Sequence, residues 1–475
     1  MSDEKIIWEP QNKQAIFMSR PEYEALYGGA AGGGKSDALL IEALRQVHIP
    51  HYRAIIFRKT YKQLSELEDR SGELYPRIIK GAKYNKSGHV WCFKTGAKIY
   101  FGAMQHTSDR INYQGKRYDF IAFDELTHFV WDEYSYMFSR NRPSGKGTRV
   151  YMRATTNPGG IGHGWVKERF ISPAPPFTTL YSKMMVPNVD GDGLVEMVRD
   201  RIFIPSTVFD NKKLLENDPF YIANLGLLPE AERNALLYGN WDSFDGQVFT
   251  EFKDNPAGYD TGKDTHVING FDVPAHWKRF VSFDFGYSHP YSVGFWTIHP
   301  KSGTLYRYHE IYGCAANTPN KGVYLPPDAI AKKIREYMDF ESKKCGVRLH
   351  YRCVADPAIW DDRYGTDASP AKVMDKYGVH FEKGNHDRLS GKMQIHYRLE
   401  FDVNGFPRMY IFKNCKDFIR TIPTIVYDKH NVEDIDTDCE DHIYDETRYF
   451  LMMNPIDRPK AEKKKPIGNF NPLNQ

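Results

Sequence analysis

The chain has 475 residues, of which 41% are apolar and 14% aromatic, so it can bury more than one core and we expect two or three domains. The formal net charge is only +3, which excludes a polycationic protein, so a surface that binds nucleic acid must come from local clusters of Lys and Arg. Six cysteines without a CxxC pair argue against a zinc ribbon or a disulfide framework. No apolar run approaches the roughly 20 residues that span a bilayer, and the N-terminal residues have no apolar signal core. We therefore expect a soluble, intracellular protein.

Residues 23–158 alternate between apolar strands and segments with helical periodicity. Strands are predicted over 23–29, 52–60, 90–103 (a hairpin), 118–125 and 149–158, and a helix over 36–48. Strands that alternate with helices favour a mostly parallel sheet, in which ligands bind at the carboxyl ends of the strands. We therefore expect an α/β fold with its binding site at that edge.

The stretch YGGAAGGGKSDALL, residues 27–40, fits the P-loop pattern GxxxxGKS. Glycines let backbone N–H groups turn inward around the β- and γ-phosphates of ATP, where a Cβ would crowd the turn or the anion. Lys35 adds a positive charge for the phosphate oxygens, and Ser36 offers a hydroxyl to Mg²⁺ at the N-terminus of a helix. The alternative is a flexible linker, but a linker would not lie between an apolar strand and a periodic helix. The glycines predicted to bind ATP are Gly29, Gly32, Gly33 and Gly34.

An acid pair, Asp124 and Glu125, ends the apolar strand YDFIAF. Asp124 can hold Mg²⁺ and Glu125 can polarise the attacking water, which favours an ATP-hydrolysing motor over a GTPase or a small-molecule kinase. The next strand ends in Thr155, Thr156 and Asn157, where a polar side chain could sense the γ-phosphate. An ordinary strand-to-loop turn is the alternative for these three residues.

The N-terminal stretch WEPQNKQAIF offers two glutamines and an aromatic residue for the adenine base. Gln11 or Gln14 could pair with the adenine edge, and Trp8 could stack on it. A solvated N-terminal arm is the alternative.

The loop contains no arginine, so an arginine that completes the site must come from elsewhere in this chain or from a neighbouring copy. Arg58 lies at a strand end, and Arg140 and Arg142 lie in a loop. Each is a candidate arginine finger, a candidate contact for DNA phosphates, or a solvated surface charge.

Prolines and short helical pieces interrupt the α/β pattern after about residue 159. A second α/β pattern follows, and the chain ends in a basic, Pro-rich stretch. We expect an N-terminal ATPase domain over 1–170, a connecting subdomain over 171–260, a second α/β domain over 261–454 and a disordered tail over 455–475.

Acids of the second α/β domain lie where strands and a helix could bring them together. Asp284 ends the strand VSFD, Asp356 follows the strand YRCVA, and His442 and Asp445 share one face of a C-terminal helix. This order of acids is the arrangement of RNase H-like nucleases, in which two divalent cations activate water and stabilise the leaving 3′ oxygen. Oxygen ligands with at most one imidazole favour Mg²⁺ or Mn²⁺. Further possible ligands are Glu310 and Asp441.

Any one of these acids could be structural, as a turn former before a proline or as part of a helix surface. The combination carries the prediction, because isolated acids at the ends of apolar strands are costly unless they are used or capped.

The motifs taken together resemble the large terminase subunit of tailed bacteriophages, the motor that packages DNA into the prohead. The resemblance runs from about residue 8 to residue 452 and is carried by GGAAGGGKS, AFDEL, ATTNPGGIGHGWVKERF, LPEAERNALLYGNWDSFDGQVF, SFDFG, VADPA and EDHIYDETRY. The P-loop is shared with many ATPases. The stretches NPGG…GHGWVKERF and LLYGNWD are more specific, and so is the order of all the parts.

The resemblance implies an ASCE-type P-loop ATPase domain, a connecting subdomain and an RNase H-like nuclease domain. It implies roles in the ATP site for Lys35, Ser36, Asp124 and Glu125, in coupling for Thr156 and Asn157, and in nuclease metal binding for Asp284, Asp356, Asp445 and His442. The implied cofactors are ATP with Mg²⁺, and two Mg²⁺ or Mn²⁺ in the nuclease. The implied partners are double-stranded DNA, the portal protein, a small terminase subunit and further copies of the chain in a ring, with action in the bacterial cytoplasm at the prohead.

A packaging motor cannot depend on sequence, so it must grip DNA through phosphates. Candidates are the loops around Arg58 and Arg140 and the stretch KGNHDRLSGK, residues 383–392. A helicase-like DNA translocase without nuclease activity is the alternative function, and it leaves the acids around Asp284 without a role. A capsid or scaffold protein is a third hypothesis, which predicts no ATP turnover.

Overall fold

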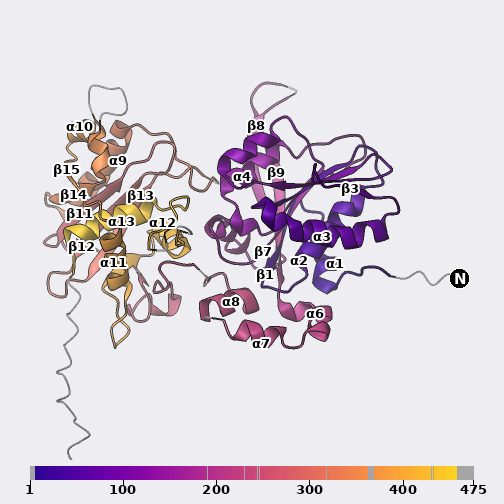
Figure 1. Cartoon of the computed structure of the whole chain (residues 1–475). Coiled ribbons are helices and arrows are strands. Elements are labelled where there is room, and N and C mark those ends of the chain that lie inside the picture. The colour runs from indigo at the N-terminus through magenta and orange to yellow at the C-terminus, as the bar shows by residue number, and fades with distance from the viewer. Residues whose placement is uncertain are drawn as a thin grey trace, which may run out of the picture. The chain divides into compact units, whose positions relative to one another are not determined.

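The computed structural model describes residues 6–189, 191–228, 230–242, 244, 246–316, 318–361, 369–428, 431 and 433–456 (Figure 1). The chain folds into two compact units. The first comprises Met1–Thr250, Asn317–Asn320 and Pro423–Glu440, and the second comprises Glu251–Ala316, Lys321–Ile422 and Asp441–Gln475. Each unit is built around a sheet of its own.

The sheet of the first unit has the order β3-β4-β5-β2-β6-β7-β1-β9-β8. The strands β5, β2, β6, β7, β1 and β9 run parallel, and the outer pairs are antiparallel. The bounds are β1 (Glu24–Gly29), β2 (Arg53–Arg58), β3 (Lys83–Asn85), β4 (Val90–Cys92), β5 (Lys98–Ala103), β6 (Phe120–Phe123), β7 (Tyr151–Thr156), β8 (Leu180–Pro187) and β9 (Leu194–Ser206). The mostly parallel α/β fold is confirmed, and β7 lies between β1 and β6 as an ASCE-type ATPase requires.

The central strands of this sheet are buried on both faces. Ala54 and Ile56 of β2 join the core on one face, and Ile55 and Phe57 join the core on the other. Successive side chains of a strand point to opposite faces, so a strand covered on both sides appears in the sequence as a continuous apolar run. Helices of this unit are α1 (Asn12–Met18), α2 (Lys35–Ala43), α3 (Tyr61–Ile78), α4 (Trp131–Tyr136), α5 (His163–Val166), α6 (Lys212–Asn217), α7 (Tyr221–Gly226) and α8 (Glu230–Tyr238).

The first sheet extends beyond residue 170, where the sequence places the first domain boundary. β9 pairs in parallel with the P-loop strand β1, and β8 pairs with β9 at the edge. The outer part of this β8–β9 ribbon is exposed on both faces, although it carries apolar side chains such as Met184, Met185, Val195 and Val198. The first unit then continues to Thr250, so residues 171–250 are part of it.

The sheet of the second unit has the order β10-β16-β13-β12-β11-β14-β15. β11, β12 and β13 are antiparallel neighbours, whereas β14 and β15 run parallel to β11, which is the RNase H-like arrangement. The bounds are β10 (Val267–Ile268), β11 (Lys278–Asp284), β12 (Ser292–Ile298), β13 (Leu305–Tyr312), β14 (Tyr351–Ala355), β15 (Phe381–Lys383) and β16 (Met409–Phe412). The helices are α9 (Pro327–Cys345), α10 (Pro370–Asp375), α11 (Arg388–Leu399), α12 (Lys416–Thr421) and α13 (His442–Met453).

The C-terminal helix α13 packs on β11 and β12 and against α11. Its Phe450 ring stacks on Trp296 of β12 with 4.6 Å between the ring centroids, and it also contacts Phe280 of β11. This packing fixes which side of α13 faces the sheet, and therefore where its first turn lies relative to the ends of the strands.

Within the described residues, no helix combines the length and the apolar character needed to cross a membrane. Residues 457–475 of the predicted tail lie outside the described residues.

Candidate functional site

The glycine-rich loop connects the end of β1 to the first turn of α2. Gly29, Gly32 and Gly34 have φ angles of +123°, +72° and +69°, a region that side chains disfavour. A Cβ on Gly33 would lie 1.9 Å from Ser206 Oγ, so a side chain there would displace the loop or β9. Local backbone geometry and close packing therefore both require the glycines of this loop.

The ammonium group of Lys35 lies buried inside this loop. Its Nζ donates to the Ala30 carbonyl oxygen at 2.5 Å and to Asn157 Oδ1 at 2.8 Å. Burial lowers the pKa of Lys35, and the nearby carboxylates of Glu125 and Asp124 oppose that shift. The structure thus brings Lys35 and Asn157, which lie far apart in the sequence, into direct contact.

Asp124 is fully buried at the carboxyl end of β6 and accepts hydrogen bonds from three different elements. Ser36 Oγ donates at 3.0 Å, Thr155 Oγ1 at 2.5 Å and Arg58 Nε at 2.8 Å. The adjacent parallel strands β2, β6 and β7 bring these groups to the same edge of the sheet. Ser36 and Asp124 offer the paired oxygen ligands that Mg²⁺ prefers.

Glu125 follows in a left-handed conformation with φ +58°. Burial raises the pKa of Glu125, and the positive charges of Lys35 and Arg58 oppose this shift. A non-glycine residue in this region is strained, and strain of this kind is often kept at functional sites. Thr156 accepts a hydrogen bond from the Thr127 backbone N–H at 3.1 Å, so the end of β7 is tied to the turn after Glu125.

The two glutamines of the N-terminal helix contact the protein itself. Gln14 Nε2 donates to the Gly34 carbonyl oxygen at 2.7 Å, and its Oε1 accepts from the Gln11 backbone N–H at 2.8 Å. Gln11 in turn bonds the Asn211 side chain and the Lys212 backbone N–H. Both atoms of each amide therefore have protein partners, which hold the end of the P-loop; recognition of adenine stays a prediction.

Asn211 and Ser206 contact the P-loop but were not identified from the sequence. Asn211 Nδ2 donates to the Gly32 carbonyl oxygen at 2.6 Å, while its Oδ1 accepts from the Leu214 backbone N–H as the N-cap of α6. The sequence signals only the cap, through an Asn before a helical stretch. Contact with a loop about 180 residues away depends on the tertiary fold.

The three arginine candidates lie at opposite edges of the sheet. Arg58 ends β2 at the carboxyl edge and bridges Asp124 to Glu66 of α3. Arg140 and Arg142 precede β7 and pair through their backbone with Tyr118, just before β6, so they lie at the amino edge. Within one chain, only Arg58 among the three is near Lys35.

The predicted acids of the second unit also meet at strand ends. Asp284 ends β11, and Asp356 follows the parallel neighbour β14, with its backbone N–H bonded to the Phe283 carbonyl oxygen at 3.1 Å. His442 Nδ1 lies 3.4 Å from Asp284 Oδ2 and 3.9 Å from Asp441 Oδ1. The first turn of α13 therefore faces the two strand ends.

These carboxylates raise one another's proton affinity. Burial raises the pKa of Asp284 well above its ordinary value, and the charges of Asp445 and Asp356 raise it further. Burial likewise raises the pKa of Asp441 to about 8, with Asp445 as the next cause. A buried group of repelling carboxylates is stabilised either by protons or by cations.

Basic side chains lie close to the same acids. Arg448 donates to Asp445 Oδ1 at 2.8 Å, and Arg388 Nη1 lies 3.9 Å from Asp445 Oδ2. His386 Nε2 lies 3.8 Å from Asp356 Oδ1. Among the described residues, no three His, Cys, Asp or Glu side chains are arranged so as to hold a metal ion. The acids are thus gathered, but their side chains lie beside histidine and arginine side chains of the chain.

The predicted DNA-binding stretch 383–392 is divided between surface and core. Lys383 is exposed and lies over the Trp360 ring at 5.6 Å. Lys392, in α11, is buried with 5% exposure. Lys392 is therefore not a surface contact for DNA in this structure, which corrects that part of the prediction.

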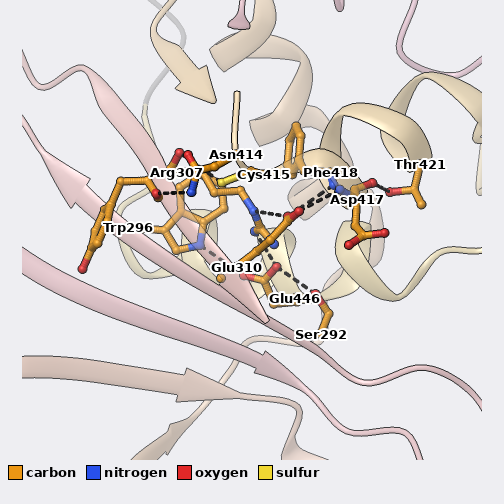
Figure 2. A network of polar contacts seen from close by, with 12 residues as sticks. Ser292, Trp296, Arg307, Glu310, Asn414, Cys415, Asp417, Phe418, Thr421 and Glu446 are labelled. Atoms are coloured by element: carbon orange, nitrogen blue, oxygen red, sulfur yellow. Dashed lines mark hydrogen bonds and ion pairs between the residues drawn. The ribbon is translucent and has the colours of Figure 1, made fainter. Parts of the chain in front are cut away.

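Glu310 belongs to a separate buried network rather than to the acidic group (Figure 2). Its Oε1 accepts from the Asp417 backbone N–H at 2.7 Å at the start of α12, and its Oε2 accepts from Arg307 Nε at 3.3 Å. Arg307 Nη1 also donates to Glu446 of α13 at 2.6 Å. Asp445 and Glu446 are neighbours, so Arg307 fixes the rotation of α13 that presents Asp445 to the strand ends.

Comparison with known families identifies the first of these two regions. Residues 26–255 match the family model described as the N-terminal part of the T4likevirus-type terminase large subunit. This N-terminal region belongs to the large terminase family. No curated protein sequence matches the chain.

Solved terminases are similar to the chain only at low identity. The large terminase of a thermophilic bacteriophage in complex with ATP-gamma-S is 17% identical over 93% of this chain and 98% of that chain, with a TM-score of 0.37. The HK97 bacteriophage large terminase is 10% identical over 93% and 95%, with a TM-score of 0.44. The P22 large terminase nuclease domain is 15% identical over 44% and 92%, with a TM-score of 0.33. No functional conclusion rests on similarities of this size.

The buried network of Arg307 gives a stability prediction. Arg307→Met leaves Glu446 and Glu310 buried without their cation, so we expect the free energy of unfolding to fall by about 3–5 kcal/mol. Arg352→Met is the matched control, because Arg352 pairs with Glu382 at the surface, where such pairs contribute less than about 1 kcal/mol. Urea denaturation of both variants measures the difference. Equal losses in the two variants would contradict the role given to Arg307.

The same network predicts a pH dependence. Burial raises the pKa of Glu310 to about 7, despite the opposing charge of Arg307. The folded state therefore binds more protons than the unfolded state between pH 4.5 and about 7. The stability that protonated Glu310 contributes is lost as the pH rises through that range. Glu310→Gln has no proton to lose. We expect the unfolding free energy of wild type minus that of Glu310→Gln to decrease over this range; a pH-independent difference contradicts the prediction.

Proposed function

We propose that the chain is the ATP-driven motor of phage DNA packaging: ATP hydrolysis in the first unit drives double-stranded DNA into the prohead, and the second unit is a two-metal endonuclease that cuts concatemeric DNA at initiation and termination. The observation that carries the proposal is the contact set of Asp124, which joins the P-loop, the acid-pair strand and β7 at one edge of a parallel sheet. The family match over residues 26–255 supports the same function.

In the ATP site, Lys35 and the backbone N–H groups of the glycine loop bind the β- and γ-phosphates. Ser36 and Asp124 would hold Mg²⁺, which would neutralise part of the charge of the phosphates. Glu125 orients the attacking water and accepts its proton, and the raised pKa that burial gives Glu125 suits a general base.

Asn157 senses the γ-phosphate through Lys35. Lys35 Nζ is bonded to Asn157 Oδ1 at 2.8 Å, and a phosphate oxygen competes for the same ammonium hydrogens. Arg58 is likewise bonded to Asp124, so its guanidinium holds the carboxylate that would bind Mg²⁺. We propose that Arg58 contacts the phosphates of the ATP that its own chain binds. Arg140 and Arg142 remain candidates for a contact with ATP in a neighbouring copy or with DNA.

In the nuclease site, Asp284, Asp356 and Asp445 would hold two Mg²⁺ or Mn²⁺, with His442 beside them. The donor set suits these ions, because the ligands are hard oxygens and burial with mutual repulsion makes Asp284 costly to ionise without a cation. To hold the ions, the acids would have to turn from their present partners His386, His442 and Arg448. Bound cations would supply an activated water and charge stabilisation for the leaving oxygen. Arg448 and Arg388 then orient Asp445 from the side of α13 and α11.

The remaining assignments follow from the proposed function. The proposed division is an ATPase domain over 1–170, a connecting subdomain over 171–260 and a nuclease over 261–454, with β8 and β9 of the connecting stretch joining the sheet of the ATPase domain. The partners are double-stranded DNA, the portal protein, a small terminase subunit and further copies in a ring, in the bacterial cytoplasm at the prohead. A helicase-like translocase is the alternative and predicts no metal-dependent cleavage.

Two substitutions separate the two activities in the full-length chain. Lys35→Ala should lower ATP hydrolysis by at least about 100-fold, because it removes a charge that stabilises the transferring phosphoryl group, and should leave Mn²⁺-dependent plasmid cleavage intact. Asp284→Ala should lower cleavage by at least about 100-fold and leave ATP hydrolysis intact. Hydrolysis is measured by phosphate release and cleavage by gel electrophoresis.

Matched controls are Lys62→Ala on the exposed face of α3 and Asp272→Ala, whose side chain is 84% exposed. Neither should change either activity. If Asp284→Ala cuts plasmid DNA as well as wild type, the nuclease assignment fails; if wild type cuts nothing, the helicase-like alternative gains support.

A further inference from the structure

His163 lies in the stretch GGIGHGWVKERF, to which the proposed function assigns no role. Its imidazole is buried with 1% exposure at the start of α5. Nδ1 accepts from the Gly159 backbone N–H at 2.9 Å, and Nε2 lies 3.0 Å from the Trp241 carbonyl oxygen. Burial lowers the pKa of His163 to about 3, so the ring is neutral and has one acceptor and one donor, which these two partners require.

On one side, His163 is connected to the nucleotide site. Gly159 is two residues after Asn157, whose side chain is bonded to Lys35. The same turn is tied to the acid-pair loop, because Thr127 Oγ1 donates to the Asn157 carbonyl oxygen at 3.0 Å. A shift of Asn157 therefore reaches the Gly159 N–H, and with it the imidazole, through a short and densely bonded turn.

On the other side, His163 is connected to two segments that lead into the second unit. Its ring stacks on Phe244 with 4.0 Å between centroids. Phe244 packs in one cluster with Ala235, Val426 and Cys439. The chain leaves the first unit at Thr250, returns at Pro423 and leaves it again at Glu440, immediately before Asp441.

These two segments are bonded to each other. The Val248 N–H donates to the Ile425 carbonyl oxygen at 2.9 Å, and the Tyr427 N–H donates to the Gly246 carbonyl oxygen at 3.0 Å. A Cβ on Gly164, next to His163, would lie 3.0 Å from Thr424 Oγ1, so α5 packs closely on the returning segment. The imidazole thus lies between the turn that contacts Lys35 and the two segments that these hydrogen bonds join at residues 246–248 and 425–427.

We propose that His163 is a positioning residue that transmits the nucleotide state from Asn157 to segments 241–250 and 423–440. The inference rests on the proposed ATP site. It goes beyond that site because it names the contacts through which a bound nucleotide affects the residues just before Asp441 and α13. A second connection runs in parallel, since the Ala31 N–H donates to the Leu236 carbonyl oxygen at 2.7 Å, directly between the P-loop and α8.

Hydrogen–deuterium exchange of the full-length chain, with and without ATPγS, tests the route. In wild type, ATPγS should alter exchange in peptides covering residues 29–36, 155–162, 241–250 and 423–428. His163→Asn keeps an acceptor for Gly159 but cannot reach Trp241, whereas His163→Gln can reach Trp241 but leaves Gly159 without its acceptor. Both variants should bind ATPγS as wild type does and lose the ATPγS-dependent difference in 241–250 and 423–428.

A distinct signature separates the two variants. Without ATPγS, the Gly159 peptide should exchange about five-fold faster in His163→Gln than in His163→Asn, because one hydrogen bond is lost. His48→Gln, at an exposed histidine of the same unit, is the matched control and should behave as wild type. A purely structural role for His163 would change exchange without ATPγS but leave the ATPγS-dependent difference in place.

Persistence of that difference at 241–250 and 423–428 in both variants overturns the proposal, as does a wild-type chain in which ATPγS alters residues 29–36 but neither segment. Absence of any effect at residues 29–36 in wild type instead overturns the proposed ATP site, and the inference falls with it. Phe244→Leu tests the route from its far side if the His163 variants fail to fold. It should keep the response at 155–162 and lose the response at 423–428.

Discussion

The buried carboxylate of Asp124 is the constraint on which the first unit depends. Burial of a carboxylate is costly unless hydrogen-bond donors surround it. Ser36, Thr155 and Arg58 supply these donors from three different elements. Those donors can converge because β2, β6 and β7 are parallel neighbours that end at one edge. Lys35 then lies between this edge and Asn157, so the glycine loop, the acid pair and the end of β7 form one bonded group.

In the second unit, the single helix α13 carries both a buried carboxylate and acids that lie beside other acids. Two neighbouring residues of α13 lie in different environments. Glu446 enters the buried network of Arg307 and Ser292 (Figure 2). Asp445 lies close enough to Asp284 for its charge to raise the pKa of Asp284. The contact between Arg307 and Glu446 holds the helix in one rotation. The guanidinium of Arg307 is fully buried, so it needs the Glu446 carboxylate to balance its charge. The outer acids can therefore repel one another without the helix turning away.

The element pattern of both units was predictable because the physical signals are local. Strands covered on both faces are continuous apolar runs, and acids or amides at their ends are conspicuous there; this is how Asp124, Asn157, Asp284 and Asp356 were found. The edge ribbon β8–β9 was missed because Pro187, Gly191 and Gly193 interrupt its apolar pattern, and because its outer part is exposed on both faces in spite of its apolar side chains. Exposure is a tertiary property that the sequence of this ribbon does not record.

The sequence by itself determined the residue types of both sites and the order in which they occur. The glycine loop needs positive φ angles and close approach, and hydrophobic burial sets the strands, so both can be recognised without coordinates. Only the tertiary structure decided the partners: that Gln14 and Asn211 hold the loop, that Glu310 caps α12, and that His163 joins Gly159 to Trp241. Hydrogen bonds between residues far apart in the chain depend on how sheets and helices pack, and no local pattern encodes that.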